Sequence, residues 1–195
     1  MNKKVNLAIF ASGNGTNAEN IVKYFNQKKN ISVVSVYVNN EHAGVIERMN
    51  RLNIPITVFH MDTLYQSSFI LDTLIKQEID FIVLAGFLKW IPINIIDKFV
   101  DRIINIHPAL LPKYGGKGMY GEKVHEQVIQ HHETISGISI HTVNSEYDKG
   151  IILFQATCPV SGTDTPETLA LKIHPLEYFY YPLVIEAWIT SKYPD

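Results

Sequence analysis

Residues 103–113, I-I-N-I-H-P-A-L-L-P-K, predict a short buried strand that carries two polar side chains. The isoleucines are β-branched and apolar, which suits a strand inside a sheet. Asn105 and His107 are two residues apart, so in a strand both side chains point to the same side. Pro108 lacks the N–H that a ladder needs, so the strand should end there. An amide and an imidazole are thus expected at the carboxyl end of a buried strand, where open α/β sheets bind ligands.

A purely structural interpretation of the two polar residues is also open: Asn105 could cap a turn, and His107 could be a satisfied polar residue at a strand end. Two features favour a functional role. Burying polar groups within a run of isoleucines is costly unless they are used. The loop that follows, L-P-K-Y-G-G-K-G-M-Y-G, is long and rich in glycine, as active-site loops often are.

Before this stretch, apolar runs that suit strands alternate with segments that suit helices. Such alternation predicts parallel pairing, right-handed crossovers and a doubly wound sheet. The expected strands are 5–11, 32–38, 56–59 and 80–85, and the expected helices are 17–28, 43–52, 67–77 and 92–99.

The carboxyl-terminal part has a different pattern, with two strands that no helix separates. After a helix over 122–131, strands are expected at 134–143 and 151–160, joined by a connection too short for a parallel crossover. These two strands should therefore pair antiparallel. A closing helix over 166–190 contains two prolines. The predicted fold class is α/β, a Rossmann-like doubly wound, mostly parallel sheet with a C-terminal antiparallel elaboration.

Composition restricts the class of protein. The 195 residues fit one domain, and 17 basic against 19 acidic residues give no indication of a nucleic-acid or membrane surface. A single cysteine, Cys158, excludes an internal disulfide framework and suits a reducing cytosol. The apolar start is short and runs directly into S-G-N-G-T-N, so it predicts a first strand rather than a signal peptide. We expect a soluble cytoplasmic domain.

The glycine-rich turn S-G-N-G-T-N lies between the first predicted strand and helix. Free N–H groups at such a helix start attract anions. With Ala18 the turn matches G-x-G-x-x-A, but the second strand ends in V-N-N without the acidic residue that holds a ribose. The turn therefore favours a single phosphate over a dinucleotide, and a tight turn without a ligand is the alternative.

Four ordered motifs carry a resemblance over nearly the whole chain: S-G-N-G-T-N, V-L-A-G-F-L, N-I-H-P-A-L-L-P-K-Y and H-T-V-N-S-E-Y-D-K-G. Together they resemble the folate-dependent formyltransferases, most closely the branch that acts on glycinamide ribonucleotide. The resemblance implies transfer of the formyl group of 10-formyltetrahydrofolate to the amine of glycinamide ribonucleotide in purine biosynthesis. It implies direct attack through a tetrahedral intermediate, with no metal. The implied partners are these two small molecules, with no nucleic acid and no membrane, in a monomer or a homodimer.

The resemblance also implies three catalytic residues, Asn105, His107 and Asp148. Taken alone, D-K-G at 148–150 is ordinary turn chemistry. In the implied mechanism the Asn105 amide and a protonated His107 donate hydrogen bonds to the developing oxyanion. Asp148 is expected to keep His107 protonated and to help move a proton between the two nitrogens.

Other positions are implied to bind the two substrates. The resemblance also implies that His141 lies near the catalytic asparagine. On residue type alone, Trp90 fits core packing, Glu177 a solvated helix face and His141 a structural role. The resemblance divides the single domain, 1–195, into a phosphate-binding parallel half over 1–105 and a folate-binding and catalytic elaboration over 106–195. The implied residues are Gly15, Thr16 and Asn17 for the phosphate, Glu177 for the amine-bearing substrate, and Leu88, Lys89, Trp90, Ile91, Asn105, Asn144, Ser145, Glu146 and Tyr147 for the folate.

Three alternatives to this function remain open on the sequence. One is a sugar-nucleotide formyltransferase, although its phosphate chemistry would not need the S-G-N-G-T-N turn in this form. A formyltetrahydrofolate deformylase shares the amide, imidazole and carboxylate but delivers water, and a catalytically idle phosphate-binding module could use the same fold. The loop 115–121 is several residues longer than the pattern common in the family, so a role for His125 in place of the usual loop histidine stays open.

Overall fold

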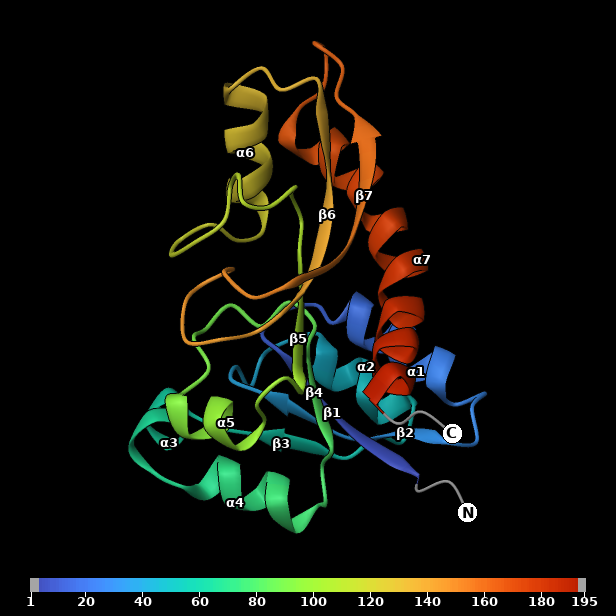
Figure 1. The fold of residues 1–195 in the computed structure, drawn as a ribbon, viewed down its shortest axis with the longest axis vertical. Helices are drawn as coiled ribbons and strands as arrows, with labels where there is room; N and C mark the ends of the chain where they lie inside the picture. The colour runs from blue at the N-terminus through green and yellow to red at the C-terminus, as the bar shows by residue number, and fades with distance from the viewer. Residues whose placement is uncertain (1–3, 193–195) are drawn as a thin grey trace. The chain divides into compact units, whose positions relative to one another are not determined.

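The computed structural model describes residues 4–192, which fall into two compact units that divide between Ile103 and Ile104. In the first unit, strands and helices alternate along the chain (Figure 1). Its elements are β1 (Val5–Ala11), α1 (Thr16–Phe25), β2 (Ile31–Val38), α2 (Val45–Arg51), β3 (Ile56–Val58), α3 (Met61–Gln66), α4 (Phe69–Lys76), β4 (Phe81–Leu84) and α5 (Ile93–Lys98).

The first unit contains the predicted parallel sheet. Its strands lie in the order β3-β2-β1-β4, and each neighbouring pair is parallel. Helices α1 and α2 lie on one side of these strands, and α3, α4 and α5 lie on the other (Figure 1). Strands β1 and β4 are buried almost throughout because helices cover both faces, which explains their continuous apolar sequence.

The second unit contains the predicted antiparallel elaboration. Strand β6 pairs antiparallel with both β5 and β7, and the long helix α7 packs against β6, β7 and α6. Tyr181 of α7 is fully buried and donates a hydrogen bond to the carbonyl of Ile104, which ties the helix to β5. The elements are β5 (Ile103–His107), α6 (Glu122–Gln130), β6 (Ile135–Thr142), β7 (Ile152–Pro159) and α7 (Pro166–Lys192).

The predicted fold class is confirmed: an α/β fold whose mostly parallel strands are followed by an antiparallel elaboration. Each predicted strand and helix is present within a few residues of its expected bounds. The sequence did not predict α3, because this short helix buries a single apolar side chain, Leu64, and so has no readable apolar period. Within residues 4–192, no helix combines the length and the hydropathy that crossing a membrane requires.

Candidate active site

The pairing of β5 with β6 places Asn105 directly opposite His141. The Asn105 amide Nδ2 lies 3.1 Å from His141 Nε2, and His141 Nδ1 lies 2.8 Å from the carbonyl of Thr142. A carbonyl only accepts, so His141 Nδ1 carries a proton and donates it to Thr142, while its Nε2 faces the Asn105 amide. This network fixes the orientation of the Asn105 side chain at the carboxyl half of β5.

His107, at the end of β5, is held through one ring nitrogen and faces a carboxylate with the other. Its Nε2 lies 2.7 Å from the backbone carbonyl of Tyr114, so Nε2 carries a proton and donates it. Its Nδ1 lies 3.7 Å from Oδ2 of Asp148. The side chain is 3% exposed. Nδ1 is therefore the ring nitrogen that remains for exchange with a reactant.

Asp148 lies in the connection between β6 and β7, and its carboxylate reaches both histidines. Oδ1 is 3.6 Å from His141 Nε2, while Oδ2 accepts a hydrogen bond of 2.9 Å from the N–H of Gly116. A Cβ on Gly115 would lie 3.3 Å from the Asp148 Cβ and 2.5 Å from a methyl of Leu111. A side chain at Gly115 would therefore force the Leu111 methyl aside and press on Asp148.

The surroundings of Asp148 and His107 lower the pKa of both groups, for different reasons. Burial by itself would raise the pKa of Asp148, but the nearby His141 ring, the Gly116 N–H and His107 together hold the pKa below its ordinary value. Burial lowers the pKa of His107 by more than Asp148 and the Tyr114 carbonyl raise it. The expectation that Asp148 keeps His107 protonated is therefore wrong for the protein without substrates: the imidazole is neutral near neutral pH because it is taken out of water.

The loop after β5 is anchored by residues that sequence reasoning missed. Ser139 of β6 accepts from the N–H of Leu111 and donates to the carbonyl of Ala109. Gln155 of β7 donates to the same serine oxygen and to the Leu111 carbonyl. These residues could have been found from the antiparallel pairing of β5 with β6, but that pairing was not predicted. The same pairing places His141 beside Asn105, where the resemblance implied a histidine.

The predicted folate residues of the second unit form an exposed turn immediately before Asp148. The Asn144 side chain accepts from the N–H of Glu146 and donates to the carbonyl of Lys149, which closes the turn. Tyr147 is 39% exposed. Ser145 lies in the same exposed turn. This segment is therefore accessible to a ligand, and its shape is set by its own asparagine.

The sequence left the roles of two further side chains of the second unit undecided. Glu177 lies on α7 and is 8% exposed, so its interpretation as a solvated helix face is wrong. His125 lies on the buried face of α6, and among residues 4–192 its Nδ1 has no hydrogen-bond partner. Burial, together with His174 and His107, lowers the pKa of His125 to about 4. His125 is thus a neutral buried side chain.

The glycine-rich turn belongs to the first unit and leads into α1. Gly15 is the residue before the helix, with φ +77°, and a Cβ there would lie 2.4 Å from the side chain of Val45. Arg48 of α2 donates to the carbonyl and to the side-chain oxygen of Asn14 and forms an ion pair with Glu19 of α1. The first N–H groups of a helix have no partner within it, so the amides of Thr16 and Asn17 sit where an anion is attracted.

The predicted folate residues of the first unit follow β4. Leu88 is 42% exposed and Lys89 is also exposed, and the N–H of Leu88 donates to Ser12. The Trp90 carbonyl accepts from the Tyr65 hydroxyl, and the two rings are stacked. Ile91 is 2% exposed. Its side chain therefore belongs to the core, and a ligand would meet only its backbone.

Residues 4–192 contain no group of three or more His, Cys, Asp or Glu side chains that could hold a metal ion.

Comparison with known proteins identifies the class. The family described as formyl transferase matches residues 5–185, and the chain belongs to this family. Among its relatives, phosphoribosylglycinamide formyltransferase of Bacillus subtilis is 33% identical over 184 residues, covering 92% of each chain. The solved structure of phosphoribosylglycinamide formyltransferase from Bacillus halodurans has a TM-score of 0.85 and 32% identity, covering 96% of each chain.

The plant relatives are longer proteins. The chloroplastic phosphoribosylglycinamide formyltransferase of Arabidopsis thaliana is 41% identical over 192 residues, which are 95% of this chain and 65% of the plant protein. For the Vigna unguiculata protein, 39% identical, the share is 61%. This chain therefore spans somewhat less than two thirds of the plant relatives it matches.

Proposed function

We propose that the chain transfers the formyl group of 10-formyltetrahydrofolate to the amine of glycinamide ribonucleotide, a step of purine biosynthesis. The observation that carries the proposal is the convergence of Asn105, His107 and Asp148, in a chain of the formyl transferase family. Its relatives in two bacteria and two plants are named for this reaction.

The proposed chemistry is a direct transfer between two nitrogens. The amine forms a bond to the formyl carbon, the carbonyl oxygen becomes an oxyanion, and the bond from carbon to the folate nitrogen then breaks. One proton leaves the attacking nitrogen and one joins the departing nitrogen. The Asn105 amide supplies a preorganised donor for the oxyanion, a contribution of about 3–4 kcal/mol to transition-state stabilisation where such donors have been measured.

His107 and Asp148 handle the proton in this proposal. The neutral imidazole donates from Nε2 to the Tyr114 carbonyl, so only Nδ1 can accept a proton from the reactants. The imidazolium that forms is stabilised by Asp148 and by the oxyanion, and it returns the proton to the leaving nitrogen. The Asp148 carboxylate thus stabilises the His107 imidazolium once it forms during the reaction. It does not keep His107 protonated before the substrates bind.

Binding roles are proposed from the accessible segments. Gly15, Thr16 and Asn17 would bind the phosphate of glycinamide ribonucleotide through the start of α1, and buried Glu177 would serve the amine-bearing substrate. The folate would contact the segment 88–91 and the turn 144–147, with Asn105 at its formyl end. In this proposal the phosphate-binding half is 1–105 and the folate-binding, catalytic half is 106–195.

We further propose a cytoplasmic setting, which a near-balanced charge and a single cysteine support. The chain would act as a monomer or a homodimer, and sedimentation of the purified protein distinguishes these two states.

One assay separates the proposed reaction from its alternatives. Purified protein is given 10-formyltetrahydrofolate with or without glycinamide ribonucleotide, and tetrahydrofolate release is followed. Release that requires the amine supports transfer. Release without the amine identifies a deformylase, and no release under either condition, with ribonucleotide binding retained, identifies a binding module.

A further inference from the structure

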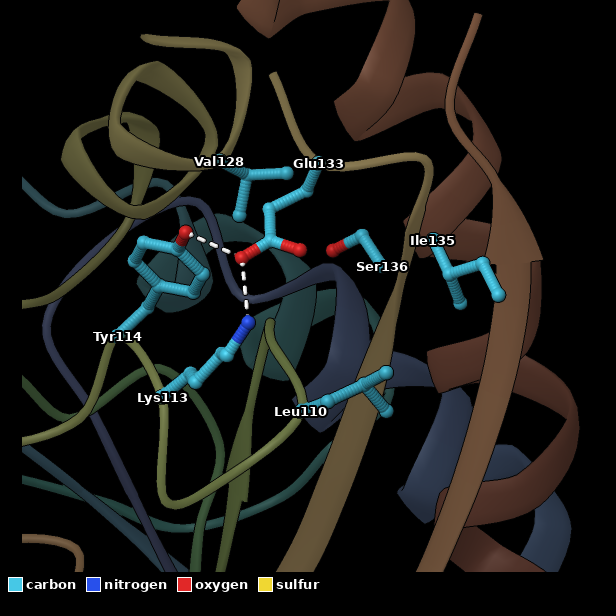
Figure 2. A pocket seen from close by; sticks show the side chains of 7 residues that line it. All are labelled: Leu110, Lys113, Tyr114, Val128, Glu133, Ile135 and Ser136. Carbon is cyan, nitrogen blue, oxygen red and sulfur yellow. Dashed lines mark hydrogen bonds and ion pairs between the residues drawn. The ribbon is translucent and has the colours of Figure 1, made fainter. Parts of the chain in front are cut away.

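The loop that contacts His107 is itself held from the far side by a single carboxylate. Glu133 lies in the connection between α6 and β6, and its Oε1 accepts from Tyr114 Oη at 2.8 Å and from Lys113 Nζ at 2.7 Å. Figure 2 shows the two side chains reaching the same carboxylate oxygen from different directions. Glu133 thus forms hydrogen bonds with two successive residues of the loop after β5.

Tyr114 connects this carboxylate to His107. Its backbone has φ +57°, a left-handed conformation that residues other than glycine, asparagine, aspartate and histidine rarely adopt. That conformation turns its carbonyl toward His107 Nε2, 2.7 Å away, while its hydroxyl remains on Glu133. An unfavourable backbone conformation persists only where its surroundings impose it. The bond to Glu133 is one such constraint.

Packing alone does not hold the loop at this point. A cavity of about 290 Å³ lies beside it, with apolar walls from Leu110, Val128 and Ile135 and with the Glu133 carboxylate in its lining (Figure 2). This cavity is partly open to solvent, so the side chains that line it lack protein contacts on that side. The polar bonds to Glu133 therefore carry a larger share of the positioning of Tyr114 than they would in a packed interior.

We propose that Glu133 is a positioning residue for formyl transfer: through Tyr114 it holds the backbone carbonyl that keeps a proton on His107 Nε2 and so reserves Nδ1 for the reactants. The inference rests on the proposed function, because it assigns His107 the proton transfer. The bonds from Lys113 and Tyr114 lower the pKa of Glu133, so the carboxylate stays ionised and able to accept both bonds near neutral pH.

Loss of the Glu133 bond to Tyr114 would change the tautomer of His107. If the Tyr114 carbonyl moves away, the neutral imidazole of His107 is free to place its proton on Nδ1, where Asp148 lies 3.7 Å away and would accept it. Nδ1 could then no longer accept a proton from the attacking nitrogen. The wrong tautomer would lower kcat and leave the KM values nearly unchanged, because neither substrate contacts Glu133 in the proposed function.

The test combines Tyr114→Phe and Glu133→Ala with Glu126→Ala as the matched control, since Glu126 is an exposed glutamate of α6. Nitrogen chemical shifts of the His107 ring report its tautomer without any substrate. They are read at pH values where Asp148 is charged, and the neighbouring His141 and His125 rings are assigned in parallel. We expect the Nε2–H form in the unmodified chain and in the control, and a shift toward Nδ1–H in both variants. The kcat of both should fall about ten- to hundredfold, as when partners that orient a functional histidine are removed.

Two results would overturn the proposal: an unchanged tautomer in both variants, whatever happens to kcat, or an altered tautomer with an unchanged kcat. If Glu133→Ala does not fold by its amide spectrum, Tyr114→Phe decides, because it removes one hydroxyl only. Failure of the proposed function is seen separately, as an unmodified chain that releases no tetrahydrofolate in the presence of glycinamide ribonucleotide.

Discussion

The buried imidazole of His125 should make the stability of the protein depend on pH between about 4 and about 6.5. In the folded chain its pKa is about 4. In the unfolded chain it returns to about 6.5. The unfolded state therefore binds a proton in this window that the folded state does not, and the free energy of unfolding falls as pH falls. Above this window both states are neutral, and the effect vanishes.

The size of the effect follows from the two pKa values. Each tenfold difference in proton affinity corresponds to about 1.4 kcal/mol, so the full loss below pH 4 is about 3 kcal/mol, and at pH 5 it is about 2 kcal/mol. Domains of this kind unfold with about 5–15 kcal/mol, so the loss at pH 5 is a large fraction of the total. His125 has this effect because its side chain is 5% exposed and because no group in the described part of the chain forms a hydrogen bond with its Nδ1.

The assay is urea unfolding at about pH 8 and about pH 5, for the unmodified chain, for His125→Gln and for His132→Gln as an exposed control. The unmodified chain and the control should lose more stability on acidification than His125→Gln, by about 2 kcal/mol. The comparison between chains cancels the contribution of His107, whose lowered pKa acts in the same direction. Equal losses in all three chains would refute the assignment of a buried, neutral His125.

The remaining predictions concern the proposed site. Asn105→Ala and His107→Ala should each lower kcat by about a hundredfold or more while the chain still folds, as its amide spectrum would show, and near-normal tetrahydrofolate release in both would reject the catalytic assignment. Asp148→Asn should move the His107 midpoint, followed by NMR titration, to lower pH, because the carboxylate raises that pKa; a midpoint that moves upward would contradict this. Gly15→Ala should weaken glycinamide ribonucleotide binding measured by calorimetry, and Gly13→Ala should not, since a Cβ at Gly13 meets nothing within 4 Å; equal effects would show that the turn is not shaped by Gly15.

Much of the fold follows from local apolar patterns in the sequence. Strand β1 was predicted with its observed bounds because helices cover both of its faces and its residues are apolar throughout. The antiparallel pair β6 and β7 followed from a connection too short for a crossover. Helix α3 was missed because six residues with one buried side chain, Leu64, show no period.

The candidate site, too, could be predicted from the sequence only in part. Asn105 and His107 could be placed together because their spacing within one strand fixes their direction. The positions of His141, Tyr114 and Glu133 depend on strand register and on loop conformation, which no short stretch of sequence encodes. The protonation of His107 was predicted wrongly because a sequence shows the charged neighbour, Asp148, but not the depth of burial that outweighs it.

The bond from the Gly116 N–H to Asp148 also determines where this chain can tolerate insertions. It fastens the loop after β5 to the connection between β6 and β7. Because His107 pairs with Ser139, the ten residues from His107 to Gly116 and the ten from Ser139 to Asp148 form a closed ring of fixed circumference. Added residues inside that ring would pull the carboxylate away from the imidazoles. Beyond Gly116, the stretch before α6 lies outside the ring, and evolution is free to lengthen or shorten it without disturbing the cluster.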